Sequence, residues 1–332
     1  MLPYFIKIIM WEFGNIKVNS KAVLAPMAGI TFYSYRKFMA KFGVGLFYSE
    51  MVSDCGLIYE NDVTLSYLKT DEDEHPFGIQ LFGNNPDSIC KAIDIIKREN
   101  CKCDFIDINL GCPVKKVTSA GSGSALLKDV DYLKDMMSKI VKHSHVPVTA
   151  KIRLGLDDNH INFLEVIRAL EEAGVSLIAI HARTKKQLYC GKPNFEIMRD
   201  LRGKMHIPLV ISGDMFDIES IKSAMEITGA DAVMLARGAM GNPTLVKQVN
   251  QYYNGEEISP NATLEEQKKY CYELAKMIVE DKGEYSGIRI FRGIGPKFFN
   301  GFKNCKQVKL AIAAQIETLE DLKNVLDEYT GE

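Results

Sequence analysis

Eight short apolar runs, each suited to a buried parallel strand, recur through the first two-thirds of the chain. Most are separated by segments with helical periodicity; Ile89, Ile93 and Ile96, for example, follow the third run at helical spacing. The runs are residues 23–26, 44–49, 77–82, 104–109, 146–151, 175–181, 207–212 and 231–236. Strand and helix thus alternate over about 230 residues, which predicts an α/β fold of the (β/α)8 TIM-barrel type.

A doubly wound open sheet is the alternative architecture for this alternation. It would require a glycine-rich phosphate-binding fingerprint after the first strand, and Pro26-Met-Ala-Gly29 does not have that form. We therefore favour the barrel.

The pattern changes after residue 255, where only helical periodicity remains. Thr263 followed by Glu266 has the form of a capping box, and a second such helix begins at Thr318. A chain of 332 residues with 46% hydrophobic composition can hold a large and a smaller domain. We expect a barrel domain over residues 1–255 and a small all-helical domain over residues 256–332.

Charge and cysteine content limit the cellular setting. The formal net charge of −2 means that any RNA contact must come from local basic patches. The eight cysteines have neither the spacing of a disulfide framework nor that of a metal site, and they indicate a reducing cytoplasm.

The apolar opening, residues 1–10, is too short to span a membrane and lacks a signal-peptide cleavage site. We expect a monomer without metal or membrane association.

Reactive and polar residues gather at the carboxyl ends of the predicted strands, the face on which barrel active sites are built. The candidates are Pro26, Met27, Ala28, Gln80, Asn109, Cys112, Lys151, His181, Ser212, Gly213, Asp214, Ala236 and Arg237. Random placement would scatter such residues over both faces of the barrel. This face is therefore the predicted active site.

The segments after the last two strands have the composition of a phosphate site. Ser212-Gly213 and Ala236-Arg237-Gly238 bring small residues, accessible backbone N–H groups and one guanidinium to loops where barrels commonly bind a cofactor phosphate. The alternative is that the glycines only turn the chain. The arginine favours phosphate, because its charge matches.

Seven segments resemble, in order, the motifs of the tRNA-dihydrouridine synthases, flavin enzymes that reduce uracil in transfer RNA. They are Ala25-Pro-Met-Ala-Gly29, Ile79-Gln-Leu-Phe-Gly83, Asp107-Ile-Asn-Leu-Gly-Cys-Pro113, Lys151-Ile-Arg153, His181-Ala-Arg-Thr184, Ser212-Gly-Asp214 and Arg237-Gly-Ala239. The resemblance covers most of residues 22–245, and the basic tail resembles the family's helical domain. Ser212 and Ala236 depart from the asparagine and glycine common in the family.

The resemblance implies FMN as cofactor and NADPH as a transient reductant, for which the sequence shows no dedicated fold. Lys151 would lie beside the flavin pyrimidine ring and stabilise the anion formed on reduction. Gln80 can donate and accept hydrogen bonds, which suits the imide edge of the flavin. His181 resembles a cofactor-contacting residue of the family, although a lone histidine at a strand end is often structural. The glycine-rich segment 120–125 lacks dinucleotide spacing and is interpreted as a flexible lead into a helix.

Cys112 is the candidate catalytic acid, mainly because of the resemblance. Reduction of uracil adds a hydride to C6 and a proton to C5, and a thiol with a pKa of about 8.5 stays protonated at neutral pH. A nucleophilic cysteine would need a positioned base, and no such pairing can be identified in the sequence. An inert buried cysteine is the other alternative. Asn109 would hydrogen-bond the uracil edge.

Cations indicate an RNA substrate. Lys115, Lys116, Arg183, Lys185 and Lys186 fall in loops on the face of Cys112, and the resemblance places Arg183 at the RNA. Residues 282–309 hold seven cations and one acid, Glu284, with interleaved aromatics that we assign to the core. The cations are Lys282, Arg289, Arg292, Lys297, Lys303, Lys306 and Lys309.

Two alternatives remain beside a tRNA-dihydrouridine synthase. One is an FMN barrel that acts on a free pyrimidine, like a dihydroorotate dehydrogenase, which has no use for the basic tail. The other is an RNA-binding protein with a degenerate barrel, which the intact Cys112, Lys151 and phosphate loops disfavour.

Overall fold

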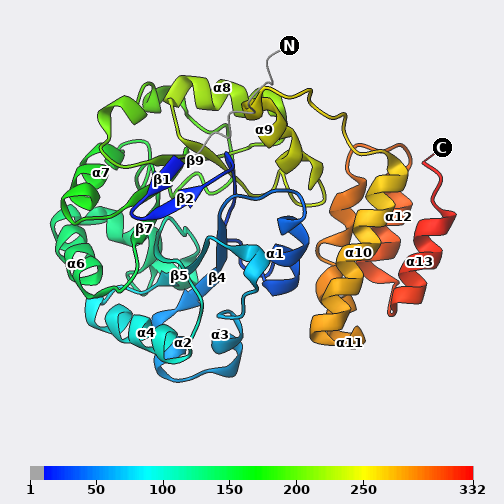
Figure 1. The fold of residues 1–332 in the computed structure, drawn as a ribbon, viewed down its shortest axis with the longest axis horizontal. Coiled ribbons are helices and arrows are strands. Elements are labelled where there is room, and N and C mark those ends of the chain that lie inside the picture. The colour runs from blue at the N-terminus through cyan, green and yellow to red at the C-terminus, as the bar shows by residue number, and fades with distance from the viewer. Residues whose placement is uncertain (1–10, 332) are drawn as a thin grey trace, which may run out of the picture.

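The computed structural model describes residues 11–331, and its centre is an eight-stranded parallel sheet ordered β3-β10-β9-β8-β7-β6-β5-β4. The sheet closes on itself where the backbone N–H of Leu24 donates to the carbonyl of Leu46 at 3.0 Å. The strands are β3 (Ala22–Leu24), β4 (Phe47–Ser53), β5 (Phe77–Phe82), β6 (Phe105–Leu110), β7 (Val148–Arg153), β8 (Leu177–His181), β9 (Leu209–Ser212) and β10 (Ala232–Leu235). The predicted barrel is confirmed (Figure 1).

Each predicted run overlaps one strand, but β4 extends to Ser53, past the predicted end at residue 49. Glu50 interrupts the apolar pattern there. It is nevertheless only 6% exposed, because it lies at the carboxyl end of the barrel and bonds the loop after β3.

Helices surround the barrel and mostly follow the predicted alternation (Figure 1). They are α1 (Tyr33–Ala40), α2 (Asp54–Ile58), α3 (Asp62–Ser66), α4 (Pro86–Arg98), α5 (Lys115–Thr118), α6 (Val130–His143), α7 (Phe163–Glu172), α8 (Ile218–Thr228) and α9 (Thr244–Asn254). Between β8 and β9 the chain instead makes two short 3-10 turns, Glu196–Met198 and Arg202–Lys204.

An antiparallel hairpin, β1 (Trp11–Phe13) and β2 (Ile16–Val18), was not predicted. Its apolar side chains pack into the barrel interior, where the ring of Phe13 meets Phe105 edge-on with centroids 5.4 Å apart. A Cβ added at Gly14, in the hairpin turn, would lie 2.8 Å from Cγ of Pro147, in the loop before β7, so the turn lies close to that loop. It therefore closes the amino-terminal end of the barrel and leaves the carboxyl end for the site.

The remaining helices, α10 (Leu264–Lys282), α11 (Glu284–Phe291), α12 (Cys305–Ala314) and α13 (Leu319–Glu328), pack together beside α1 (Figure 1). The predicted capping box of Thr263 and Glu266 is confirmed, as is the one at Thr318. Tyr270 of α10 packs against Phe42 with ring centroids 5.1 Å apart, so the two parts share one apolar core.

The opening residues 1–10, expected neither to span a membrane nor to act as a signal peptide, lie outside the described residues. Over residues 11–331, no helix has the length and apolarity needed to cross a bilayer. All eight cysteines are free thiols.

Candidate active site

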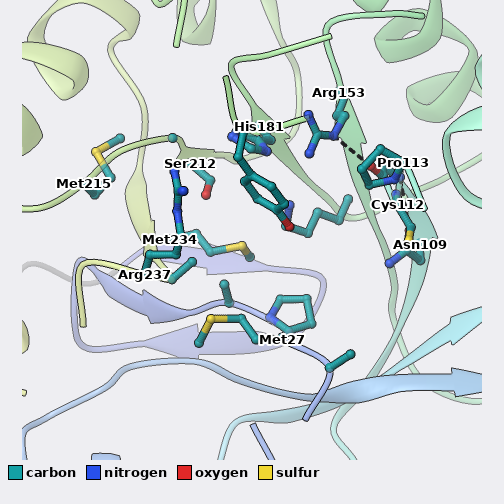
Figure 2. Close-up of a pocket in the computed structure, with 18 of the residues that line it drawn as sticks. Met27, Asn109, Cys112, Pro113, Arg153, His181, Ser212, Met215, Met234 and Arg237 are labelled. Carbon is teal, nitrogen blue, oxygen red and sulfur yellow. Dashed lines mark hydrogen bonds between the residues drawn. The ribbon is translucent and has the colours of Figure 1, made fainter. Parts of the chain in front are cut away.

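A cavity of about 320 Å³ opens at the carboxyl ends of the barrel strands, within the size range of small-molecule sites. Figure 2 shows Asn109 and Cys112 on one side of it and Ser212 and Arg237 on the opposite side. Its lining includes thirteen of the predicted site residues: Pro26, Met27, Ala28, Gln80, Asn109, Cys112, Lys151, His181, Ser212, Gly213, Asp214, Ala236 and Arg237.

The loops after β9 and β10 form one corner of the cavity, which contains backbone N–H groups and the Arg237 guanidinium. The backbone N–H groups of Gly213, Asp214, Arg237 and Gly238 donate no hydrogen bond to any described residue. Gly238 cannot be replaced without movement, because an added Cβ would lie 1.7 Å from the carbonyl oxygen of Met215. Free N–H groups beside a guanidinium are an arrangement that binds phosphate.

Asp214 holds the arginines of this corner. Its carboxylate accepts from Arg237 Nη2 at 2.6 Å and from Arg183 Nη1 at 3.0 Å. Arg183, which we expected to contact RNA, is fully buried, and its guanidinium also donates to the carbonyls of Cys190 and Gly191. In this structure Arg183 therefore supports Asp214 and offers no surface to RNA, a placement that the sequence motif alone did not reveal.

A buried chain of hydrogen bonds crosses the floor of the cavity from β7 to the Cys112 loop. Thr149 Oγ1 and Gln80 Nε2 each donate to Asp107 at 2.6 Å, and Asn109 Nδ2 donates to Gln80 Oε1 at 2.8 Å. Asn109 Oδ1 in turn accepts from the backbone N–H of Cys112 at 2.8 Å. The chain fixes the orientation of both amides, so each has one N–H left for a ligand.

Two further hydrogen bonds, to the carbonyls of Gly111 and Cys112, hold the Cys112 loop in place. Ser124 Oγ donates to the Cys112 carbonyl at 2.8 Å, and Arg153 Nε donates to the Gly111 carbonyl at 2.9 Å. The segment that we expected to be a flexible lead into a helix thus contains a buried serine that fixes the loop. Cys112 itself is 8% exposed and lines the cavity.

Burial sets the protonation states of the cavity. Burial, and the charge of Arg153 beside it, lower the pKa of Lys151 to about 8. Burial also lowers the pKa of His181 far below its ordinary value, helped by the charge of Lys151 and three arginines, so this imidazole is neutral. Burial raises the pKa of the Cys112 thiol, which therefore stays protonated at neutral pH.

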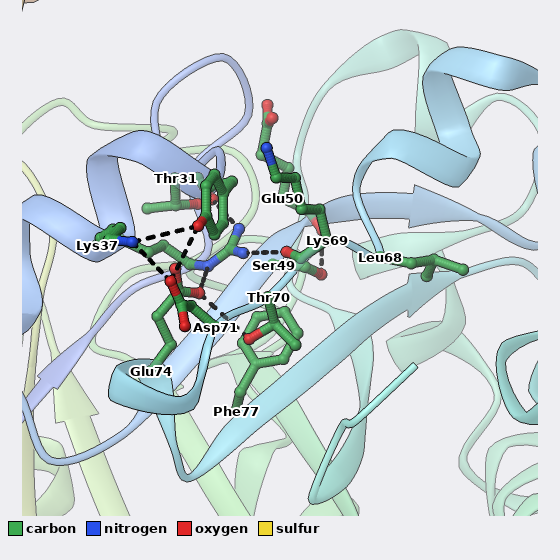
Figure 3. Close-up of polar contacts among 12 residues, drawn as sticks. Thr31, Lys37, Ser49, Glu50, Leu68, Lys69, Thr70, Asp71, Glu74 and Phe77 are labelled. Atoms are coloured by element: carbon green, nitrogen blue, oxygen red, sulfur yellow. Dashed lines mark hydrogen bonds and ion pairs between the residues drawn. The ribbon is translucent and has the colours of Figure 1, made fainter. Parts of the chain in front are cut away.

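The loop after β3, which carries Pro26, Met27 and Ala28, is held from behind by a buried network (Figure 3). Arg36, 1% exposed, donates to Glu74 at 2.9 Å and to the Thr31 carbonyl at 2.8 Å. Thr31 Oγ1 accepts from the Met27 N–H at 2.9 Å, and Glu50 accepts from the Gly29 N–H. Figure 3 shows Thr31 and Glu74 among the residues of this network, and the bonds to Met27 and Gly29 connect the loop to it.

Several lining residues were not among the predicted ones. Arg153 stands two positions after Lys151 on the same strand, and strand alternation could have placed it on the same face. Tyr189 is 58% exposed and lies 4.9 Å from the Arg237 guanidinium, ring centroid to Cζ; it has no sequence signal. Lys185 is half-buried outside the cavity lining, whereas Lys297 lines a neighbouring cavity that also includes Arg237.

Comparison with known proteins gives a family match. A model of the dihydrouridine synthase (Dus) family matches residues 23–331. A probable tRNA-dihydrouridine synthase of Rickettsia bellii is 31% identical over 97% of this chain and 98% of its own. The tRNA-dihydrouridine synthase B of Pasteurella multocida is 32% identical over 84% of this chain and 83% of its own.

Solved structures resemble the barrel. The old yellow enzyme homologue of Zymomonas mobilis has a TM-score of 0.50 at 12% identity, covering 78% of this chain and 95% of its own. Morphinone reductase has a TM-score of 0.51 at 11% identity, covering 76% of this chain and 90% of its own. At such low identity these similarities support the fold alone.

Proposed function

Because this chain belongs to the dihydrouridine synthase family, we propose that it reduces uridines in tRNA to 5,6-dihydrouridine with FMN as cofactor and NADPH as reductant. The observation that carries this proposal is the cavity in which a protonated thiol faces an anion-binding corner. We further propose that the protein acts as a monomer in the cytoplasm.

The residues present fit FMN. The free N–H groups of Gly213, Asp214, Arg237 and Gly238 would hold its phosphate, together with the Arg237 guanidinium. Apolar lining residues, among them Pro26, Met27, Met51 and Met234, offer a surface for a flat ring. Lys151, Gln80 and neutral His181 would supply polar contacts to it.

When bound and reduced, FMN would supply the hydride that adds to C6 of uracil. Cys112 then transfers the proton of its thiol to C5: the S–H bond breaks, the C5–H bond forms, and the thiolate recovers a proton from solvent. The backbone N–H of Val114 and the charges of Arg153 and Lys151 lower the thiol pKa against the larger effect of burial, so they stabilise the thiolate left behind. Asn109 holds the Cys112 N–H and keeps one N–H for the uracil edge.

The helical domain, residues 256–332, would bind the tRNA. Lys297, Lys303 and Lys306 are exposed and form no ion pair or hydrogen bond with another described residue through their ammonium groups. The expected core role of the interleaved aromatics is confirmed for Phe291, Phe298 and Phe299, while Tyr285 is 75% exposed.

The test is conversion of an unmodified tRNA transcript by purified protein with NADPH, followed by nucleoside analysis. We expect dihydrouridine in the transcript, a flavin spectrum in the protein, and no turnover of free uridine monophosphate or orotate. Turnover of either small molecule at the tRNA rate would favour the free-pyrimidine enzyme. Loss of dihydrouridine from the tRNA of a deletion strain would support the same assignment in the cell.

A further inference from the structure

A second cavity of about 430 Å³ adjoins the first, between the loop after β10 and the start of the helical domain. Phe216, Arg237 and Gly238 line both cavities, so these three residues form the wall between neighbouring sites. The full lining of the second cavity is Phe216, Arg237, Gly238, Met240, Gly241, Asn242, Asn261, Ala262, Gln267, Lys297, Asn300, Gly301 and Phe302. The proposed chemistry at Cys112 does not use it.

Close backbone contacts fix the shape of this cavity. Gln267, 7% exposed on α10, donates from Nε2 to the Gly241 carbonyl at 3.1 Å. Gly241 has φ +70°, and an added Cβ would lie 2.3 Å from the carbonyl carbon of Lys297. The barrel loop and the helical domain are thus in direct contact here, and these contacts fix the walls of the cavity.

Hydrogen-bonding groups in the lining lack partners within the described part of the chain. The side-chain amide of Asn242 makes no hydrogen bond there, and Asn300 uses only its oxygen, which accepts from Lys309 Nζ at 2.8 Å. The buried Gln267 Oε1 also has no donor among residues 11–331. A buried acceptor without a donor is costly, and a bound molecule that supplies an N–H or O–H removes that cost.

The charge and the apolar walls narrow the class of ligand. Lys297 and Arg237 provide cations, while Phe216 (48% exposed) and Phe302 provide aromatic surface. A cation beside an aromatic surface and free amides can bind the phosphate, the flat face and the polar edge of a nucleotide. Two further exposed lysines, Lys303 and Lys306, follow Lys297 in the sequence, and like it they have no ion-pair partner among residues 11–331.

We propose that the second cavity binds one nucleotide of the tRNA next to the uridine that enters the first cavity. The inference rests on the proposed function, because an extruded uridine remains joined to its neighbours through phosphates. The neighbouring base contacts Phe216 and the amides of Asn242 and Asn300, and its phosphate lies near Lys297. The cavity therefore contributes to the choice of the uridine that is reduced.

The experiment compares tRNA binding by Asn242→Ala/Asn300→Ala with binding by wild type, in fluorescence anisotropy with an unmodified tRNA transcript. Asn15→Ala is the matched control, because Asn15 is an exposed asparagine at the opposite end of the barrel. We expect the double variant to lose about five- to hundredfold in affinity, and the control to lose nothing. Asn242→Asp, nearly the same shape but negative, should also weaken binding because it repels phosphate.

Flavin content, flavin reduction by NADPH and the melting temperature are measured on the same variants. The proposal predicts wild-type values for all three, which a variant with a damaged fold would not give. Wild-type tRNA affinity in both Asn242 variants would overturn it. Slower reduction by NADPH with unchanged tRNA affinity would also overturn it and would assign the cavity to the reductant.

Failure of the proposed function gives a different result. In that case wild-type protein forms no dihydrouridine in any tRNA, whatever the residue at position 242. If wild type forms dihydrouridine and the variants match it in affinity and rate at subsaturating tRNA, only the nucleotide site is wrong.

Discussion

The cations of the barrel mouth and those of residues 297–306, from the segment after α11 to the first turn of α12, are held in opposite ways. Arg153 and Arg183, 2% and 0% exposed, donate to backbone carbonyls and, in the case of Arg183, to Asp214. Lys297, Lys303 and Lys306 are exposed, and within residues 11–331 no other group pairs with their ammonium groups.

This contrast separates two kinds of recognition. Groups fixed before binding lose little conformational freedom when a small, planar ligand arrives, and they act in a low-dielectric cavity. Exposed lysines keep their freedom and attract a polyanion through counterion release, which depends strongly on salt. We therefore expect variants of the barrel mouth to change chemistry or cofactor, and variants of the lysine surface to change only tRNA affinity.

The largest expected effect is that of Cys112→Ala. Dihydrouridine formation should fall by about 10²–10⁴-fold, the usual contribution of a positioned acid, while flavin content and flavin reduction by NADPH stay at wild-type values. Rapid-mixing measurement of flavin reoxidation by tRNA checks this. Cys112→Ser should recover little, because a hydroxyl is a much weaker acid.

Charge reversal of Lys297, Lys303 and Lys306 to Glu tests the other region. Loss of three phosphate contacts should weaken tRNA binding about hundredfold at ~0.15 M salt and reduce the slope of log affinity against log salt by roughly 2–3. The same reversal at Lys91, Lys97 and Lys142, exposed on the barrel exterior, is the control. An unchanged salt slope would make the lysine surface purely structural.

Arg237→Ala should reduce FMN affinity about ten- to hundredfold, because one charge-assisted phosphate contact is lost. Flavin retained after gel filtration is the measurement, with the exposed Arg199→Ala as control. Full retention of flavin by the Arg237 variant would place the phosphate elsewhere in the cavity.

The smallest effect is expected for Asp107→Asn, which alters the support of Gln80 and Asn109 without touching the ligand. Turnover should fall severalfold while flavin stays bound.

Asp107 should also make stability depend on pH. Burial raises the pKa of Asp107 to about 6 in the folded protein, above the ordinary 3.8, so the folded protein binds the Asp107 proton more tightly than the unfolded chain does. Protonated Asp107 therefore stabilises the folded protein fully below about pH 4, and this contribution to the free energy of unfolding is lost as pH rises through about 6. Urea unfolding should show that loss in wild type and a smaller one in the variant.

The barrel could be predicted from the sequence because buried parallel strands are continuous apolar runs, and helices between them have a distinct period. The hairpin at residues 11–18 could not, since each of its strands has only three residues. The break after β8 also carries no signal, because its 3-10 turns are shorter than any reliable helical period.

The candidate site was predictable where one residue at a strand end is informative, as with Cys112, Lys151 and Arg237. Its connections were not, because they depend on register between strands. Gln80 is paired with Asp107 across β5 and β6, and only that pairing brings the carboxylate to the amide. Arg183 shows the reverse: its motif indicated a ligand contact, while the fold buries it behind Asp214.

The most direct test of the separation between chemistry and RNA capture is a single-turnover titration with tRNA. Anaerobically reduced wild type, Cys112→Ala and the Lys297/Lys303/Lys306→Glu variant are mixed with increasing unmodified tRNA, and dihydrouridine is measured. We expect the lysine variant to approach the wild-type rate at saturation, and the Cys112 variant to remain about 10²–10⁴-fold slower at every concentration. A Cys112 variant that reaches the wild-type rate, or a lysine variant that stays slow at saturation, would contradict the account.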